Sequence, residues 1–510
     1  MKRIFTFITA LVVTISVATA AIVNGTCGDD LTWSLNTQDS ILTIEGTGAM
    51  TDYYSYQNAP WDNYWSYIAY VSLSDGLTKI GSRAFFACRN IKSVSIPNNV
   101  TSIGQEAFRY NKKLSIVTFG NRVSSIGSRA FEGCAGITSI ELPNSVYSIG
   151  SYAFSECGNL TTITIGNINS IGDYAFNKCN RLAAIDLPNG LSTIGSYAFY
   201  ECTGLTSVDV PSSATNIGTY AFGSCSNLTS AILPDGILDI PESIFNGCNS
   251  LTSIIIPNSA RSIGSNAFAG CSSLASVQLG ENVIYIYGYA FYNCRSLTTI
   301  EIPSKVYSIT STAFSNCKSL TTIIWNAKHG ADAQYTYPQF GGDKTTVTSI
   351  SFGSEVEYVP ASLCYKMSGL TSVEIPNGVM AVGNYAFSLC DHLTTVSIGD
   401  GISTLGEYSF PNTVTHLTVA ATTPPSGGLN CGINPAVCTL YVPEGSVDIY
   451  SNTLWWEDFF EILPIQNSGT NIDYTLVNDI KTIKAFIRGQ IYVIRDKKTY
   501  TITGQQVRRD

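Results

Sequence analysis

The chain has 510 residues, of which only 13% are charged, and its net charge is −9. A chain of this length exceeds what one compact core usually supports, so several domains or an array of repeats is expected. The acidic balance argues against nucleic acid as a partner, because a phosphate backbone is held by clustered Lys and Arg.

The first 20 residues predict a secretory signal peptide. Lys2 and Arg3 precede an apolar run over residues 4–17, and residues 18–20 form a small-residue cleavage site. An apolar run of this length is too short to span a bilayer, which needs about 20 residues. We therefore expect cleavage after Ala20, and a mature protein that is secreted or held on the outer cell surface. No later stretch predicts a transmembrane segment.

A unit of 22–23 residues recurs from about residue 71 to 417. Its pattern is Leu-Thr-x-Ile-x-Ile-Pro, then Ile-Gly-x-x-Ala-Phe-x-x-Cys. A unit this short cannot close a core alone, so neighbouring copies must cover each other's apolar face. We predict a solenoid of about 14 leucine-rich-type repeats, mainly β with short helical or 3-10 turns. Equivalent Phe side chains should form a ladder with a spacing of about 4.8 Å.

Eleven of the 15 cysteines occupy one position of this unit. Asn111 and Met367 stand there in two other units, so the position is neither a catalytic nucleophile nor a metal ligand. Disulfides between successive repeats are conceivable at this spacing, but an odd number of cysteines cannot all pair. We predict reduced thiols that pack inside the solenoid.

This pattern resembles the BspA-type, or treponemal-type, leucine-rich repeat of secreted and surface proteins from Bacteroidetes and other host-associated microbes. The resemblance implies binding of host matrix or plasma proteins, or of other microbial cells. Residues 21–70 also resemble the N-terminal β cap of such proteins. Where Pro241, Tyr287 and Thr310 replace the Gly of Ile-Gly, the repeats are expected to bend or bulge.

The period fails at an irregular insertion over about residues 325–346, which is either a binding loop or a tolerated excursion. Residues 418–465 resemble the C-terminal capping region of the family, with an aromatic cluster at Trp455, Trp456, Phe459 and Phe460 that seals the last repeat. In this region Cys431 and Cys438 lie outside the repeat column, and they are the best candidates for a disulfide in an exported protein.

The last segment, residues 466–510, predicts a small β tail. Its alternating apolar and polar residues indicate two or three short strands with a turn at Arg495-Asp496. The segment resembles the C-terminal sorting or anchoring modules of Bacteroidetes secreted proteins. A small β cap without an export role is the alternative.

Two surfaces are candidates for binding. The first is the outward side of the repeated strand, where exposed isoleucines often mark a contact; its residues are Thr206, Ser207, Asp209, Thr229, Ser230, Ile232, Thr252, Ser253, Ile255 and Gln278. The second is an aromatic strip before the Ala-Phe pairs, formed by Tyr152, Tyr174, Tyr197 and Tyr220. The alternative for the strip is that each ring only packs over its neighbour.

No pattern in the sequence predicts catalysis. His329, His392 and His416 lie in unrelated contexts, and no metalloprotease, nucleophile-elbow or phosphate-loop motif is present. We therefore expect no enzymatic activity, no cofactor and no metal site. The leading hypothesis is an adhesin or protein-recognition module with protein ligands. The alternatives are a glycan-binding accessory protein and a structural surface scaffold.

Overall fold

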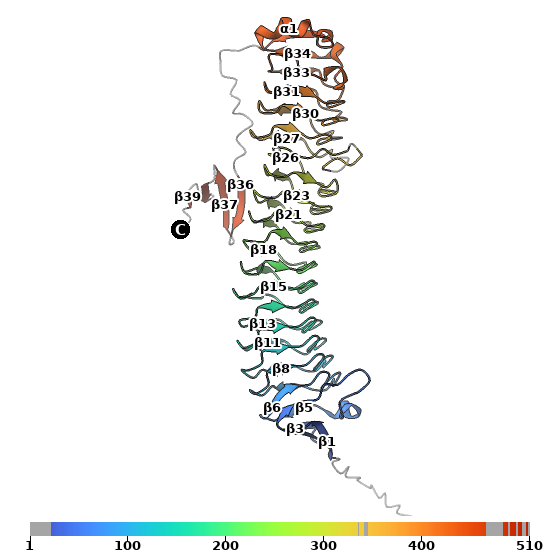
Figure 1. Cartoon of the computed structure of the whole chain (residues 1–510), viewed down its shortest axis with the longest axis vertical. Helices are drawn as coiled ribbons and strands as arrows, with labels where there is room; N and C mark the ends of the chain where they lie inside the picture. Colours follow the sequence, from blue (N-terminus) through green and yellow to red (C-terminus); the bar gives the residue numbers. More distant parts are fainter. Residues whose placement is uncertain are drawn as a thin grey trace, which may run out of the picture.

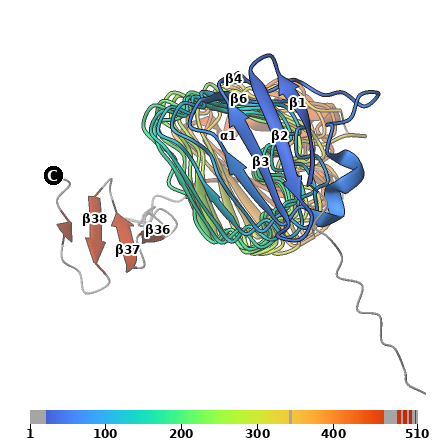
Figure 2. The ribbon, with the colours of Figure 1, turned by 90° about the horizontal axis from the view of Figure 1, so that it is seen from below.

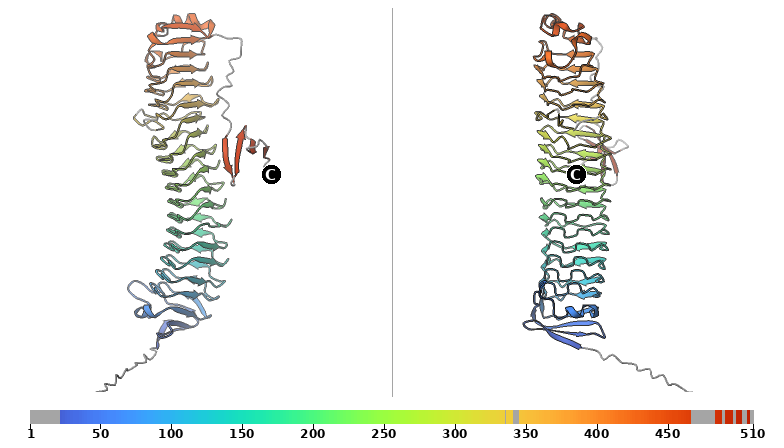
Figure 3. Two further views of the ribbon diagram at one scale, coloured as in Figure 1. Left: turned by 180° about the vertical axis from the view of Figure 1, so that it is seen from behind. Right: turned by 90° about the vertical axis from the view of Figure 1, so that its right-hand side faces the viewer.

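A computed structural model shows a long rod of about 17 stacked coils with little helix (Figure 1). The structure describes residues 22–334, 336–340 and 345–465, and the backbone of four short strands between 483 and 507. The predicted solenoid is confirmed. The predicted signal peptide lies outside the described residues. Viewed along the rod, successive coils superimpose closely (Figure 2), and the rod curves gently (Figure 3).

The N-terminal end is a small sheet that continues into the solenoid. Strands β1 (Ile22–Gly28), β2 (Leu31–Asn36) and β3 (Ile41–Gly46) are antiparallel, and β3 then pairs in parallel with β5 (Tyr70–Leu73). A 3-10 helix, η1 (Asp62–Tyr67), leads into β5. The antiparallel hairpin therefore covers the edge that the first coil would otherwise leave open.

Most coils contribute a first strand of three or four residues and a second strand that usually has two, although the coil that contains residues 182–187 forms no first strand. The first strands after β5 are β7 (Ser93–Ser95), β9 (Ile116–Thr118), β11 (Ser139–Leu142), β13 (Thr162–Ile165), β16 (Ser207–Asp209), β18 (Ser230–Ile232), β20 (Ser253–Ile255), β22 (Ser276–Gln278), β24 (Thr299–Ile302), β26 (Thr322–Trp325), β27 (Ser349–Phe352), β29 (Ser372–Ile375), β31 (Thr395–Ile398) and β33 (His416–Val419). The second strands are β4 (Gly48–Ala49), β6 (Leu77–Ile80), β8 (Ser102–Ile103), β10 (Ser125–Ile126), β12 (Ser148–Ile149), β14 (Ser170–Ile171), β15 (Thr193–Ile194), β17 (Asn216–Ile217), β19 (Asp239–Ile240), β21 (Ser262–Ile263), β23 (Tyr285–Ile286), β25 (Ser308–Ile309), β28 (Tyr358–Val359), β30 (Ala381–Val382) and β32 (Thr404–Leu405). Strands of successive coils pair in parallel, so equivalent residues form straight columns.

The third side of the coil differs from the expected helical or 3-10 turns. In the described coils of the solenoid it consists of consecutive tight turns whose backbone also bonds to the next coil, as where the Phe245 amide donates to the Ala267 carbonyl at 2.9 Å. In most coils two residues take left-handed backbone angles there, for example Asn266 (φ 56°) and Gly270 (φ 78°). Left-handed angles cannot continue a right-handed helix. They direct the backbone N–H of every second residue on this side toward a carbonyl of the next coil.

The core is a column of stacked aromatic rings, as predicted. It begins at Trp61, whose ring lies 5.7 Å from that of Phe85, and it continues with Phe–Phe centroid distances of 5.0 to 5.8 Å. The repeated cysteines lie beside it and are fully buried. Gly264 allows close approach of the coils, because a Cβ there would lie 2.7 Å from the Glu242 amide nitrogen.

The insertion expected at 325–346 is one longer coil of the same stack. Thr322 pairs with Ser349, a step of 27 residues instead of 23, and Phe340 is buried with its ring 5.4 Å from that of Phe314. Phe340 therefore fills the aromatic column although the sequence period is lost. Of the substituted Gly positions, Pro241 coincides with a break between β17 and β19, whereas strand pairing continues across Tyr287.

Two similar loops protrude from the same side of the rod, one in the N-terminal cap and one in the longer coil (Figures 1 and 3). Each contains an isolated antiparallel bridge, Tyr54 with Gln57 and Gln334 with Tyr337. Each is preceded by an aspartate, Asp52 or Asp332, whose carboxylate accepts a backbone amide of the next coil. The longer coil and the N-terminal cap thus share the same loop: an aspartate that bonds to the next coil, followed by a short antiparallel bridge.

The C-terminal end is closed by β34 (Thr439–Val442), β35 (Glu461–Pro464), helix α1 (Val447–Ser451) and the 3-10 helices η2 (Gly428–Asn430), η3 (Pro435–Val437), η4 (Glu444–Ser446) and η5 (Trp456–Asp458). Trp455, Trp456 and Phe459 are buried and pack against one another, but Phe460 is 73% exposed and takes no part in the seal. It follows Phe459 directly in extended backbone, where neighbouring side chains point to opposite sides.

The disulfide between Cys431 and Cys438 stays a prediction; in the structure the two residues are present as separate thiols. Both are fully buried. Burial raises the pKa of Cys431 to about 11 and that of Cys438 to about 12, with the nearby Cys431 adding to the effect on Cys438. Two neutral thiols thus pack in the cap as the column cysteines do in the coils.

The tail contains four short strands where two or three were expected. They are β36 (Ile483–Ile487), β37 (Gln490–Arg495), β38 (Lys498–Thr501) and β39 (Gln506–Val507), and they form one antiparallel sheet in chain order. The expected turn after Arg495 agrees with the end of β37.

Candidate recognition surfaces

The predicted first-strand face lies on β16, β18, β20 and β22 and on the residues that lead into these strands. Nine of its ten residues are exposed, and Ser253 is half-buried. Asp209 pairs with Ile232, and Ile255 pairs with Gln278, so these four outward residues follow one another across successive coils. The alternation that buries Val208 and Ile254 leaves their neighbours facing solvent.

Part of this face serves the stacking of the coils. The Thr229 hydroxyl donates to the Thr206 carbonyl at 3.0 Å, and the Thr252 hydroxyl donates to the Thr229 carbonyl at 3.3 Å. These hydroxyls are therefore engaged with the preceding coil. The side chains that stand farthest into solvent include the two isoleucines, 55% and 57% exposed. The exposed polar Asp209 and Gln278 lie beside them.

The tyrosine strip is a closed stack. The rings of Tyr152, Tyr174, Tyr197 and Tyr220 are nearly parallel, with centroid distances of 4.6, 4.6 and 4.8 Å. The guanidinium of Arg129 lies 4.1 Å from the ring centre of Tyr152 and covers its outer face. Partial burial, with a smaller effect of the neighbouring tyrosines, raises the pKa of Tyr174 and Tyr197. The strip therefore offers ring edges and hydroxyls, while neighbours occupy its ring faces.

The same column continues toward the N-terminus as a network of ion pairs that the sequence analysis did not identify. Arg83 contacts Glu106, and Arg109 lies between Glu106 and Glu132, with its Nε 2.8 Å from a Glu132 oxygen. Arg129 then joins Glu132 at 2.9 Å. Burial alone would lower the pKa of Arg109, but the nearby Glu132, Tyr110 and Glu106 together raise it. In the sequence, this network is indicated by Arg and Glu residues spaced 23 positions apart.

A second feature that the sequence analysis did not single out is a cluster of open tyrosines. It lies on two successive coils, and each ring is 40–53% exposed: Tyr285, Tyr287, Tyr289, Tyr292 and Tyr307. The rings of Tyr285 and Tyr287 lie 6.2 Å apart with a 15° angle between their planes, and Tyr307 stands edge-on to Tyr285. In the sequence, this cluster is indicated by the tyrosines at every second position from 285 to 289.

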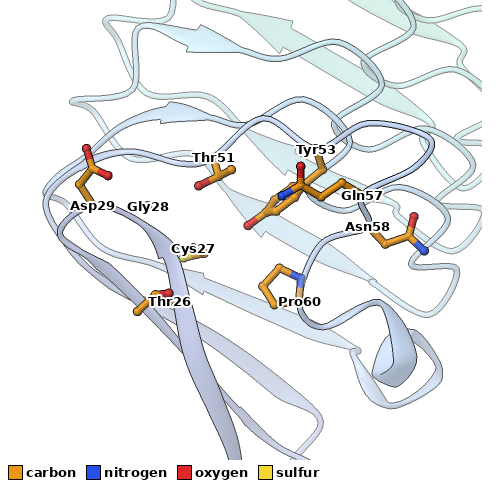
Figure 4. Close-up of a pocket in the computed structure, with 9 residues that line it drawn as sticks. All are labelled: Thr26, Cys27, Gly28, Asp29, Thr51, Tyr53, Gln57, Asn58 and Pro60. Atoms are coloured by element: carbon orange, nitrogen blue, oxygen red, sulfur yellow. The ribbon is translucent and has the colours of Figure 1, made fainter.

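The N-terminal cap contains an open hollow of about 330 Å³ (Figure 4). Tyr53, Gln57 and Pro60 line one side, and Cys27 and Asp29 lie on the other. Burial raises the pKa of Cys27 to about 11, so this thiol stays protonated near neutral pH and is a poor nucleophile. The lining includes no histidine that could serve as its base.

The three histidines lie apart on exposed surface of the coils. His329 faces Glu357 at 3.2 Å, His392 contacts the Ser368 carbonyl, and His416 lies 3.0 Å from the Thr415 hydroxyl. Within the described residues, no group of three His, Cys, Asp or Glu side chains is placed to hold a metal ion. The described residues also contain no helix long and apolar enough to cross a membrane.

Several solved structures are similar to this chain. A leucine-rich repeat protein from Bacteroides ovatus is 19% identical and covers 82% of this chain and 99% of its own, with a TM-score of 0.45. A leucine-rich cell surface protein from Faecalibacterium prausnitzii is 25% identical over 60% of this chain and 95% of its own, with a TM-score of 0.32. The pneumococcal vaccine antigen PcpA is 17% identical over 88% and 99%, with a TM-score of 0.35. No curated protein matches the sequence.

The model of the BspA type leucine-rich repeat region matches most of the solenoid. The matches cover residues 63–180, 166–252, 238–335 and 339–423. They include every coil with the Ala-Phe pattern, and the break between the last two matches falls inside the longer coil. The chain therefore belongs to the BspA-type leucine-rich repeat family.

Proposed function

We propose that this protein is an exported, cell-surface adhesin or protein-recognition module that acts without catalysis. The observation that carries the proposal is the pair of exposed isoleucines, Ile232 and Ile255, on neighbouring first strands. Exposed aliphatic side chains on a hydroxyl-rich rod mark a contact, because each is stabilised when a partner removes it from water. The signal-peptide pattern supports export, and the resemblance of the tail to sorting modules supports surface attachment.

The rod suits recognition of an extended or large partner. On its first strands, Asp209, Ile232, Ile255 and Gln278 stand on four consecutive coils, so polar residues flank the apolar pair. An apolar centre with a polar rim is the usual anatomy of a protein contact. The protein ligands we propose are host extracellular proteins or surface components of other bacteria.

The closed tyrosine stack gives little support to the glycan-binding alternative at that strip. A sugar ring binds an aromatic side chain across the ring face, and the faces of Tyr174 and Tyr197 are occupied by their neighbours. The scaffold alternative requires the rods to associate with one another, which the experiment below also measures.

The test is a pull-down with the mature chain, residues 21–510, against immobilised host matrix proteins and whole bacteria. The double variant I232D/I255D is expected to lower retention at least tenfold, because it places two charges in the apolar centre of the contact. The matched control is L238D, since Leu238 is 52% exposed on another side of the same part of the rod. It should retain the wild-type binding.

Three results would count against the proposal. If the wild-type chain retains no partner, the adhesin function is wrong. If L238D loses binding as strongly as the double variant, the first-strand face is not the site. If sedimentation instead shows concentration-dependent self-association that I232D/I255D abolishes, the face joins copies of this chain and the scaffold function holds.

A further inference from the structure

Positive charge is concentrated in the N-terminal quarter of the solenoid. Residues 76–130 contain nine Lys and Arg against one acidic residue, a balance of +8 in a chain whose net charge is −9. Residues 131–465 contain nine basic and 25 acidic residues, a balance of −16. The whole-chain charge therefore conceals a basic segment next to a long acidic one.

Five of these nine cations have no acidic partner. Lys79, Arg83, Arg109 and Arg129 form ion pairs with the carboxylates of Asp52, Glu106 and Glu132. The others are exposed and form no ion pair with any described residue: Arg89, Lys92, Lys112, Lys113 and Arg122. Unpaired cations on neighbouring coils repel one another, so an anion bound among them is favoured.

Four of the five gather at one corner of the rod, where the chain turns into the first strand. Arg89 and Lys112 occupy equivalent positions of successive coils, and the Lys113 ammonium donates to the Asn90 side chain at 2.9 Å. The Lys92 ammonium lies 5.3 Å from the centre of the Tyr70 ring and 3.4 Å from its hydroxyl. The fifth cation, Arg122, lies beyond the other end of β9.

Exposed aromatic rings border these cations. Trp65 and Tyr67 of η1 are 41% and 52% exposed, and Tyr70 of β5 is 43% exposed. The Arg89 guanidinium lies 6.0 Å from the centre of the Trp65 ring. The Asn90 side-chain amide donates to the Ser66 carbonyl at 2.8 Å and so fixes η1 against the basic turn. We call this surface the aromatic–cationic patch: Trp65, Tyr67, Tyr70, Arg89, Lys92, Lys112 and Lys113.

We propose that the aromatic–cationic patch binds an acidic polysaccharide, whose sugars carry carboxylate or sulfate groups. The C–H face of a sugar ring packs on an exposed aromatic ring, while its acidic group pairs with Lys or Arg. This site is separate from the isoleucine pair on β18 and β20, so the two functions can fail independently.

Other anionic partners fit the patch less well. A peptide cannot add as a strand, because β5 and β7 are each paired on both sides. A nucleic acid carries one charge per nucleotide and depends on many phosphate contacts, whereas the patch offers four cations beside a strongly acidic segment. An acidic polysaccharide offers C–H ring faces to the exposed aromatic rings as well as charge to the cations, and the acidic segments on both sides of residues 76–130 confine its binding to the patch.

The test measures binding of the mature chain, residues 21–510, to immobilised polygalacturonate and dextran sulfate, with uncharged dextran and single-stranded DNA alongside. Binding to at least one acidic polysaccharide is expected at 50 mM salt, weakening as salt rises. K112Q/K113Q should weaken it about tenfold or more, whereas R122Q, an equally unpaired cation outside the patch, should change it less than twofold. W65A should weaken polysaccharide binding at least threefold, because it removes the ring on which a sugar packs.

Near-ultraviolet circular dichroism that matches the wild type shows that a variant keeps its fold. If W65A does not fold, K112Q/K113Q alone tests the proposal. The proposal is overturned if neither acidic polysaccharide binds, or if R122Q is as harmful as K112Q/K113Q. Tighter binding of single-stranded DNA than of either polysaccharide, with the same loss in K112Q/K113Q, assigns the patch to nucleic acid instead. If W65A folds and binds the polysaccharide as tightly as the wild type, the patch binds through charge alone, and this result also contradicts the proposal.

Discussion

At the scale of single residues, the repeated cysteine is a hydrogen-bond donor inside the core. The Cys271 thiol donates to the Phe245 carbonyl of the preceding coil at 3.3 Å, and eight other column cysteines donate to the equivalent Phe carbonyl over 3.0 to 3.3 Å. Cys390 donates to the Cys364 carbonyl at 3.1 Å. Asn111 takes the same role through its amide, which donates to the Phe85 carbonyl at 2.7 Å. Cys and Asn share this position because both can donate to that carbonyl, whereas Met367 fills it with a buried apolar side chain that cannot donate.

Asn111→Cys is expected to stabilise the protein by about 1 kcal/mol. The buried Asn111 Oδ1 has no hydrogen-bond partner among the described residues, and such an atom costs about 1–3 kcal/mol. A thiol would keep the donation to Phe85 and remove that atom. Urea unfolding measures the change, with Cys134→Asn as the reverse variant, which should destabilise. A loss of stability in Asn111→Cys would show that the hydrogen bonds of the Asn111 amide stabilise the protein by more than its unpaired oxygen costs.

At the scale of elements, the C-terminal cap contains neighbouring aromatic residues with opposite roles. Trp456 is 2% exposed and packs between Tyr450 and Phe459, whereas Phe460 is 73% exposed. The Tyr450 hydroxyl donates to the Ala421 carbonyl at 3.0 Å and joins the cap to the last coils. The seal of the rod thus depends on the three buried aromatics that precede Phe460.

Trp456→Ala is expected to destabilise the cap by about 3–5 kcal/mol, because truncating a buried large aromatic leaves a cavity. Phe460→Ala is the matched control and should change stability by less than about 0.5 kcal/mol. Limited proteolysis near residues 440–460 measures the local loss, since a solenoid unfolds from weakened ends. Equal sensitivity of the two variants would contradict the packing described for this cap.

At the scale of the whole molecule, the buried thiols make the rod sensitive to alkaline pH. Burial raises the pKa of Cys271 from 9.0 to about 12, and it raises the pKa of Cys157 and Cys225 to about the same value. Between these values the unfolded chain loses the proton and the folded chain keeps it. The stabilisation is therefore complete below pH 9 and is lost as the pH rises toward 12.

We expect the urea midpoint to stay nearly constant from pH 6 to 8 and to fall steeply from pH 9 to 11. Each thiol removes roughly 1.4 kcal/mol per pH unit in this window, so a few of them exhaust the stability of an ordinary domain. The variant Cys225→Ala/Cys271→Ala should show a shallower fall. An equal slope in that variant would assign the alkaline loss to other groups.

Much of this molecule could be predicted because its pattern is local and repeated. The Phe and Cys columns follow from the period, since a 23-residue unit has one way to cover its apolar side. The longer coil could not be predicted, because Phe340 fills the column from an irregular loop. The turns on the third side depend on left-handed angles at residues such as Tyr152 (φ 59°), which residue type alone does not indicate.

The candidate surfaces were only partly predictable. The exposed isoleucines follow from strand alternation, but the closure of the tyrosine stack depends on the spacing between coils, which brings ring faces into contact. The aromatic–cationic patch was missed because the net charge averages a basic segment with an acidic one. A count in windows of two repeats would have found it.

The parallel register of the coils also determines how the length of the protein can change. Removing or duplicating one 23-residue unit leaves every remaining strand paired and shifts the two ends by only about 4.8 Å. The N-terminal patch and the C-terminal tail lie on units that such a change would not touch. Distance between the two ends is therefore a property that can be adjusted in small, equal steps, independently of what either end binds.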